Sequence, residues 1–546
     1  MKSGAFRCCL ALLVSVALQG ASGIAHAQKN DGAGVSKDIK KVMDQPAYQG
    51  ATWGLRVVDL ENGKELVNLN PGRQFFIASV RKNFSVGELM DQVGPGHRYN
   101  TPVYVEGKVN SHGVLDGNLV LVASGDLTMG GRTNPDGTIA YTVFDHNEAN
   151  ALGNAVLSKP DPLAGYKALA SQVAASGIKE IKGDVVIDDR LFKPYEFRKE
   201  FDMRPIFVND DIVDLIINPK PLGDFASLHH RPVSEALTIK NEVEMTASNT
   251  EASIRPELPA CIGERGGCSV TLQGNLPVAY TPPLTGAYPL IRYYRITKPS
   301  AFARTIFIEE LRAAGVAVKA SAVGPNPEQL LPARNSYDTK ARVAELDGMP
   351  YSEDAKLVMK VSYNLGADTS LLLWGLTAGV NNMAAALDVE KRNLSENFGI
   401  PQSEYNFVDG SGDGDTTATN EVVTHFLSEM SKRSYFPDYL ASFPILGVDG
   451  SLGTVTDFEE NKTLAPAKGK VFAKTGTYLG LGSTGLELEL KAQAFGGYIT
   501  TKCGKKLAYQ LVVYGVHIAN QDDPIPEIVN VFQDEGRISA ILWRDF

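Results

Sequence analysis

Apolar and polar positions change period several times along the chain, and each change predicts a different element. Residues 57–69 alternate around Asn62-Gly63, a pattern typical of a β-hairpin. Apolar positions then recur at helical spacing over residues 75–84. From about residue 99 to 289, short β-like runs alternate with Gly, Asn and Pro turns, which predicts a mainly β insert.

Helical spacing returns after this insert and gives way to strand alternation near the C-terminus. We expect helices over residues 301–315, 356–378, 381–398 and 525–532, and strands over residues 471–475, 494–500 and 507–516. Strands and helices in this mixture predict an α/β fold of the α+β kind, interrupted by the insert.

The N-terminus has the pattern of a secretory signal peptide over residues 1–27. Positive charge precedes an apolar stretch, residues 8–18, and small residues end at Ala25-His26-Ala27. The apolar stretch is short for the ~20 residues of a membrane-spanning helix, so we expect cleavage before Gln28 rather than an anchor.

Composition and charge remove several classes of function. The 546 residues are 43% hydrophobic and 21% charged, which predicts globular domains rather than a disordered or polytopic membrane protein. The net charge of −10 argues against a nucleic-acid partner, which requires basic surface. Zinc spacing is absent, and Asn420 stands where a calcium loop needs its bidentate acid, so we expect no metal and no organic cofactor.

Export would place the cysteines in an oxidising compartment. Cys261 and Cys268 flank a Gly-rich turn and predict a local disulfide, with two free thiols as the alternative. Cys503 is left over in a predicted hairpin turn, and we assign it no catalytic role because nothing nearby supplies a base.

Three short motifs in one order carry the candidate chemistry. They are S-x-x-K at Ser79–Lys82, S-x-N at Ser362–Asn364, and K-T-G at Lys474–Gly476. Singly each is weak, and residues 176–179 also match S-x-x-K. The first motif, however, begins a predicted helix, where residues three apart share a face. The last lies on a predicted strand, and S-x-N lies between them in the helical region.

These residue types suit acyl transfer by a serine. A serine hydroxyl needs an adjacent base, and no His/Asp pair stands out, so we expect Ser79 to use an uncharged Lys82. Burial and a second cation, Lys474, would both disfavour a charged Lys82. Ser362 and Asn364 would relay the proton and hold the substrate amide. The alternative is that both lysines lie in solvent and Ser362 caps a helix.

Two further roles follow from the same chemistry. Lys474 and Thr475 of the K-T-G motif would bind a substrate carboxylate. The oxyanion needs two backbone N–H donors, and we expect those of Ser79 and Thr477 to supply them.

With these motifs, the sequence resembles the class C low-molecular-mass penicillin-binding proteins, the D-alanyl-D-alanine carboxypeptidases and endopeptidases of bacterial peptidoglycan. The resemblance covers about residues 50–520. Beyond the three motifs it is carried by residues 125–128, 183–188, 362–368, 409–412 and 447–452. It implies a penicillin-binding domain like that of serine β-lactamases, an antiparallel sheet flanked by helices, split by a large insert.

The implied domains are a discontinuous catalytic domain, residues 28–94 and 293–546, and the insert, residues 95–292. A nested subdomain is expected near residues 212–288. The chain departs from the family at Tyr363, where Asp is common, and at residues 136–160, which look like extra sequence.

The resemblance also implies a residue that reads the substrate. Asp210 aligns best with the family acid that binds the amine of a diamino acid in the stem peptide. The alternative is that Asp210 caps a turn or helix, as Asn-Asp pairs commonly do.

The function that the resemblance implies is a serine D-Ala-D-Ala carboxypeptidase or D,D-endopeptidase. It would act on peptidoglycan stem peptides through a Ser79 acyl-enzyme, and β-lactam antibiotics would acylate the same serine. We expect a periplasmic protein, with loose membrane association and oligomeric state left open. The rival functions are a β-lactamase or esterase on the same scaffold and a non-catalytic module that binds peptidoglycan.

Overall fold

The structure is a computed structural model that describes residues 32–254, 256, 267–482 and 485–546. The chain divides into two compact units, the first made of Met1–Pro95 and Ala355–Phe546 and the second of Gly96–Asp354. The predicted signal peptide, residues 1–27, lies outside the described residues. Within those residues, the longest apolar helices fall short of what a membrane crossing requires.

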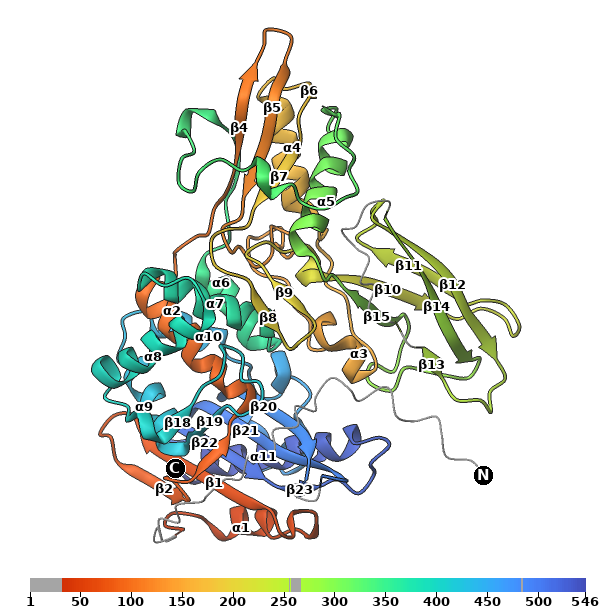
Figure 1. The fold of residues 1–546 in the computed structure, drawn as a ribbon. Coiled ribbons are helices and arrows are strands. Elements are labelled where there is room, and N and C mark those ends of the chain that lie inside the picture. The colour runs from red at the N-terminus through yellow and green to blue at the C-terminus, as the bar shows by residue number, and fades with distance from the viewer. Residues whose placement is uncertain (1–31, 255, 257–266, 483–484) are drawn as a thin grey trace. The chain divides into compact units, whose positions relative to one another are not determined.

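The first unit is built on an antiparallel sheet in the order β2-β1-β22-β21-β20, with β23 paired to β21 (Figure 1). Its strands are β1 (Thr52–Asp59), β2 (Glu65–Leu69), β20 (Val471–Leu481), β21 (Leu488–Thr500), β22 (Lys506–Tyr514) and β23 (Val516–His517). The predicted N-terminal hairpin is β1 and β2. Strand β1 pairs along its whole length with β22. The sheet is therefore completed by an early and a late segment of the chain, and the second unit is inserted between them in sequence.

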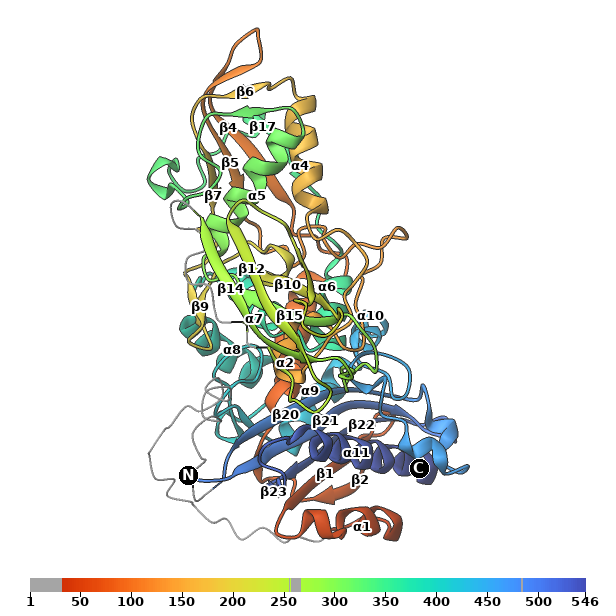
Figure 2. The same cartoon turned by 90° about the vertical axis from the view of Figure 1, so that its right-hand side faces the viewer.

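Helices pack on both faces of this sheet. On one face, α11 (Ile525–Asp545) lies against β21, and α1 (Lys37–Met43) lies against α11 (Figure 2). The side chains of α11 and the strands form one apolar core, which includes Leu55, Phe495, Leu511, Ile538 and Leu542. The other helices are α2 (Lys82–Val93), α7 (Asn364–Thr377), α8 (Met383–Phe398), α9 (Asn420–Met430) and α10 (Phe436–Ser442).

A small sheet joins the segment before the nucleophile to the middle of the chain. Its order is β18-β19-β3, with bounds Tyr405–Asn406, Thr417–Thr419 and Gln74–Phe76. Since β3 ends just before Ser79 and β18 and β19 flank residues 407–416, this sheet brings the latter segment next to the start of α2.

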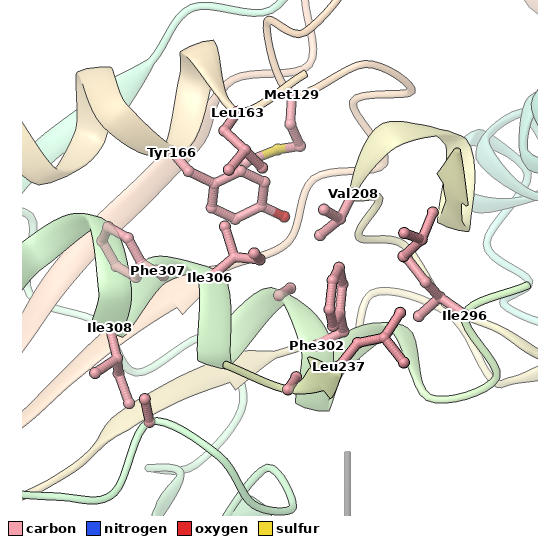
Figure 3. Packing of buried hydrophobic residues seen from close by; sticks show 14 of the residues in the cluster. Met129, Leu163, Tyr166, Val208, Leu237, Ile296, Phe302, Ile306, Phe307 and Ile308 are labelled. Atoms are coloured by element: carbon pink, nitrogen blue, oxygen red, sulfur yellow. The ribbon is translucent and has the colours of Figure 1, made fainter. Parts of the chain in front are cut away.

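The second unit carries its own sheet, in the order β16-β6-β5-β4-β17 with β7 paired to β5. The strands are β4 (Thr101–Val109), β5 (Val114–Val122), β6 (Glu180–Ile181), β7 (Val185–Asp188), β16 (Ala317–Val318) and β17 (Arg342–Leu346). The helices α4 (Ala164–Ala175) and α5 (Pro299–Ala313) pack together, and α3 (Ala149–Leu152) contacts β15. Figure 3 shows part of the core, in which Tyr166, Phe302 and Phe307 are fully or almost fully buried.

Smaller β elements account for the region expected to hold a nested subdomain. Two three-stranded sheets, β11-β10-β15 and β12-β14-β13, and the hairpin of β8 and β9 belong to this unit. The bounds are β8 (Tyr195–Phe197), β9 (Phe201–Met203), β10 (Ile212–Asn218), β11 (Ser227–Arg231), β12 (Leu237–Thr246), β13 (Ser253–Ile254), β14 (Cys268–Pro277) and β15 (Leu290–Arg295).

The insert is longer than the sequence predicted. We expected the chain to return to the catalytic domain at residue 293, but the second unit extends to Asp354, inside α6 (Tyr351–Lys360). The reason is that α5 packs on α4, β16 pairs with β6, and β17 pairs with β4. Helical spacing shows that α5 exists, but it does not show which sheet the helix covers.

Two predicted helices also change their bounds. The pattern over residues 356–378 is two helices, α6 and α7, separated at Ser362, whose φ of 61° is incompatible with a continuing helix. The C-terminal helix runs to Asp545 rather than ending near residue 532, because its apolar face continues to pack on the sheet.

Cys268 is disulfide-bonded, and Cys503 is an exposed free thiol. Cys261 lies outside the described residues, so its pairing with Cys268 stays a prediction. The Cys503 thiol donates to the backbone oxygen of Phe546 over 2.7 Å.

Candidate active site

Ser79 lies in a short 3-10 helix, η2 (Ala78–Arg81), that runs directly into α2. The preceding residue, Ala78, has a φ of 43°, a left-handed conformation that a non-glycine residue rarely adopts. The turn carries Ser79 into the helix, so its side chain and that of Lys82 meet three residues apart. The Lys82 Nζ lies 2.7 Å from the Ser79 Oγ.

Lys82 is fully buried among oxygen atoms. In addition to Ser79, its Nζ lies 2.7 Å from the Oδ1 of Asn364 and 2.8 Å from the carbonyl oxygen of Ser411. The S-x-x-K and S-x-N motifs therefore meet at the Lys82 amine. Asn364, which makes the S-x-N contact, is the first residue of α7.

Ser362 and Lys474 form a second serine–lysine pair. The Lys474 Nζ donates to the Ser362 Oγ over 2.9 Å and to the Thr475 carbonyl over 2.7 Å. Complete burial, together with the nearby charge of Lys82, lowers the pKa of Lys474 well below its ordinary value.

Gly476 allows β20 to lie against the nucleophile turn. A Cβ at this position would lie 2.4 Å from the Ile77 carbonyl oxygen and 3.1 Å from the Ser79 nitrogen, so no larger residue fits. This close approach is the reason that K-T-G requires its glycine. It also brings the strand that carries Thr477 beside the backbone of Ser79.

The neighbours of Gly476 are held by side chains. The hydroxyl groups of Thr475 and Ser451 lie 2.8 Å apart, and the Thr477 hydroxyl donates to the Gln493 Oε1 over 2.9 Å. Ser451 belongs to residues 447–452, one of the segments that carry the family resemblance. Here that segment braces the catalytic strand.

A buried ion pair beneath the site was not predicted. Arg81, inside the S-x-x-K motif itself, donates to the carboxylate of Glu390 over 2.6 and 2.7 Å, and both side chains are buried. Burial and the adjacent Glu390 raise the pKa of Glu88 well above its usual value. The Phe407 ring lies 4.2 Å from the guanidinium carbon of Arg81.

Asp210 belongs to the second unit, whereas the other predicted site residues all lie in the first. Its carboxylate is 3% exposed and contacts the Arg132 guanidinium. It also lies 2.9 Å from the His146 Nε2 and accepts from the Asn147 amide over 3.3 Å. Burial alone would raise the pKa of Asp210, but Arg132 and His146 lower it strongly.

The residues that surround Asp210 come partly from the extra segment, residues 136–160. Asp145, His146 and Asp210 are placed closely enough to hold a metal ion. Arg132, however, lies among them and donates to both Asp145 oxygens over 2.7 and 2.9 Å. Its guanidinium already supplies the positive charge that these carboxylates need, so we assign no metal here.

His146 makes the stability of the insert dependent on pH. Burial opposes its charge, but Asp214 (2.7 Å from the Nδ1) and Asp210 outweigh burial and Arg132, raising the pKa of His146 to about 9. The protonated ring therefore stabilises the fold fully below its unfolded pKa of about 6.5, and this contribution is lost as pH rises through about 9. The amount is on the order of 3 kcal/mol.

We expect the thermal unfolding temperature to fall between about pH 6 and about pH 9, and to fall less in His146→Gln. Calorimetry of both proteins at matched ionic strength measures the difference. A parallel loss in the two proteins would place the pH dependence elsewhere.

An antiparallel sheet flanked by helices, with a serine–lysine pair at a helix start beside a K-T-G strand, defines a serine hydrolase of the penicillin-binding fold. The chain belongs to the D-Ala-D-Ala carboxypeptidase 3 (S13) family, whose sequence model matches residues 35–533. This confirms the resemblance and the expected class of enzyme.

Known proteins match the chain over most of its length. The chain is 24% identical over 503 residues to the D-alanyl-D-alanine carboxypeptidase of Actinomadura sp. (strain R39), covering 88% of this chain and 80% of the relative. Penicillin binding protein 4 from Haemophilus influenzae matches with a TM-score of 0.66 at 18% identity, covering 93% of this chain and 99% of that one. A β-lactam complex of the same protein matches with a TM-score of 0.62 at 17% identity, over 93% and 100% of the two chains.

Proposed function

We propose that this enzyme hydrolyses D-alanyl-D-alanine or cross-linked bonds of peptidoglycan stem peptides through an acyl-enzyme on Ser79. The observation that carries the proposal is the buried Lys82 Nζ, 2.7 Å from the Ser79 Oγ and supported by two further oxygen acceptors. Membership of the D-Ala-D-Ala carboxypeptidase family supports the substrate class.

In the acylation step, the Ser79 Oγ forms a bond to the substrate carbonyl carbon and its proton passes to the Lys82 Nζ. The carbonyl oxygen becomes an oxyanion, for which the N–H groups of Ser79 and Thr477 are the proposed donors. The carbon–nitrogen bond then breaks. The leaving nitrogen takes a proton from the Ser362 hydroxyl, which is refilled by the proton that Lys82 holds.

Deacylation repeats these steps with water in place of the leaving amine. A water oxygen bonds to the acyl carbon, its proton passes to Lys82, and the carbon–oxygen bond to Ser79 breaks. The Ser79 Oγ recovers the proton. Lys474, Thr475 and Gly476 would bind the terminal carboxylate of a carboxypeptidase substrate, since the N–H groups of a lysine and a hydroxyl can donate to that anion.

Digestion of purified peptidoglycan, with product masses read directly, tests this proposal. Release of D-alanine or resolution of cross-linked dimers is the expected result. Unchanged peptidoglycan together with rapid turnover of penicillin would instead identify a β-lactamase. The proposed location, a periplasmic mature protein that begins at Gln28, is checked by N-terminal sequencing of the exported protein.

Asp210 remains our proposed reader of the substrate's diamino-acid amine, which would have to replace one of its present donors. We expect Asp210→Asn to slow cleavage of a peptide with a free amine about ten- to a hundredfold, the loss of a charge-assisted hydrogen bond. Acylation by a simple penicillin, which lacks the amine, should change little. Steady-state peptide assays and penicillin acylation rates measure both.

A structural role for Asp210 gives a different pattern. If Asp210 only balances Arg132 and His146, the two rates fall together and the unfolding temperature falls with them. His146→Gln serves as the matched control, because it perturbs the same cluster and keeps the Asp210 carboxylate.

A further inference from the structure

The sequence of Asp409-Gly410-Ser411-Gly412 resembles the start of a calcium loop, one whose bidentate acid is replaced by Asn420. In the structure it is a buried turn whose third residue presents its carbonyl oxygen to the Lys82 Nζ at 2.8 Å. We infer that this turn is the positioning element for the catalytic base, an inference that rests on the proposed function.

The argument begins with what a neutral amine can do. An uncharged lysine has two N–H groups and one lone pair. The Asn364 Oδ1 and the Ser411 carbonyl oxygen can only accept, so they take the two N–H groups. The Lys82 Nζ also lies 2.7 Å from the Ser79 Oγ, close enough for its lone pair to accept the serine proton. The Ser411 carbonyl therefore orients Lys82 toward the nucleophile. In a catalytic triad, the third residue orients the base in the same way.

The turn is held rigidly from inside. The Asp409 Oδ1 accepts from the Ser411 N–H over 3.0 Å and from the Gly412 N–H over 2.6 Å. The Asp409 Oδ2 accepts from the Ser411 hydroxyl over 3.0 Å and from the Asp413 N–H over 3.2 Å. A single buried carboxylate thus fixes the orientation of the peptide that follows Ser411.

The turn is also held from outside by the helices that carry the motif residues. The Asp368 Oδ1 accepts from the Gly410 N–H over 2.9 Å, and Asp368 lies one helical turn after Asn364 on α7. One helix therefore supplies one acceptor for Lys82 and places the other. Arg81, next to Lys82, donates to the Asp409 carbonyl over 2.9 Å.

The two glycines let the turn come this close. A Cβ at Gly410 would lie 2.5 Å from the Ala367 carbonyl oxygen, and one at Gly412 would lie 2.0 Å from the Ala78 carbonyl oxygen. Both contacts are with backbone, which cannot move aside cheaply. Any side chain at residue 410 must push the turn, and the Ser411 carbonyl with it, away from α7.

Gly410→Ala tests the inference, with Gly414→Asn as the matched control. Gly414 lies in the same segment with a φ of 52° and has nothing within 4 Å of a Cβ, and Asn tolerates this conformation. Stopped-flow acylation with a fluorescent penicillin separates the binding constant from the limiting acylation rate. We expect Gly410→Ala to lower the limiting rate about 10- to 100-fold, as small misplacements of a base do. Binding should stay within about twofold, and Gly414→Asn should match the wild type in both constants.

Asp368→Ala removes the acceptor of the Gly410 N–H without added volume, and it serves if Gly410→Ala does not fold. A limiting rate equal to wild type in a folded Gly410→Ala or Asp368→Ala protein overturns the inference, as does a loss confined to the binding constant. The proposed function fails separately, if the wild-type protein itself is not acylated on Ser79.

Discussion

Ser79→Ala is expected to abolish covalent labelling of the protein by fluorescent penicillin. The acyl-enzyme is an ester to the serine oxygen, so removing that oxygen removes the bond rather than slowing its formation. The position tolerates alanine, because the substitution deletes one atom from a 3-10 turn whose backbone stays in place. Gel fluorescence and mass mapping of the labelled peptide measure the result.

The second S-x-x-K match provides the control. Ser176 ends α4 in the second unit, where its hydroxyl donates to the Val173 carbonyl over 2.7 Å. We expect Ser176→Ala to be labelled like the wild type. Labelling that persists in Ser79→Ala, or that maps to Ser176, would contradict the assignment of the nucleophile.

The local structure of the motifs could be predicted because each one coincides with an element whose period is visible in the sequence. Apolar spacing placed Ser79 at a helix start, and alternation placed Lys474 on a strand. The order of the motifs and the family resemblance then indicated that they meet. The two serine–lysine distances, 2.7 and 2.9 Å, agree with that expectation.

Other features could not be predicted, for identifiable reasons. The acceptor from Ser411 is a backbone carbonyl. Every residue has one, so the identity of the residue does not indicate this contact. The end of the insert at Asp354 depends on β17 pairing with β4, a contact between residues more than two hundred positions apart. The negative charge of Asp210 is balanced by Arg132 and His146, and these residues come next to Asp210 only in the folded insert.

The fold also explains why a large insert leaves the site intact. The nucleophile turn, the S-x-N motif and β20 are all in the first unit, which the two ends of the chain complete. The insert enters after α2 and leaves within α6, just before Ser362. Changes within the insert, including the extra segment at residues 136–160, therefore need not alter the distances among the catalytic side chains.

Lys82→Met is expected to slow acylation by penicillin by about 10²–10⁴-fold, the usual contribution of a general base. Methionine keeps most of the buried aliphatic stem while removing the amine that lies 2.7 Å from the Ser79 Oγ. The Asn364 and Ser411 oxygens lose a donor, at a cost of about 1–3 kcal/mol each. Removing the buried amine also removes the cost of burying it, which offsets this loss. We therefore expect only a small change in unfolding temperature, alongside the large loss of acylation rate.

Lys82→Arg separates a base from a charge. A guanidinium stays protonated in proteins and cannot take the Ser79 proton, yet it supplies the same positive charge. If Lys82 is the base, the arginine variant acylates as slowly as Lys82→Met. If acylation by Lys82→Arg approaches the wild-type rate, Lys82 acts only through its charge, and the base must be another group near Ser79. Limiting acylation rates for the three proteins, measured with the penicillin used for Ser79→Ala, decide between these outcomes.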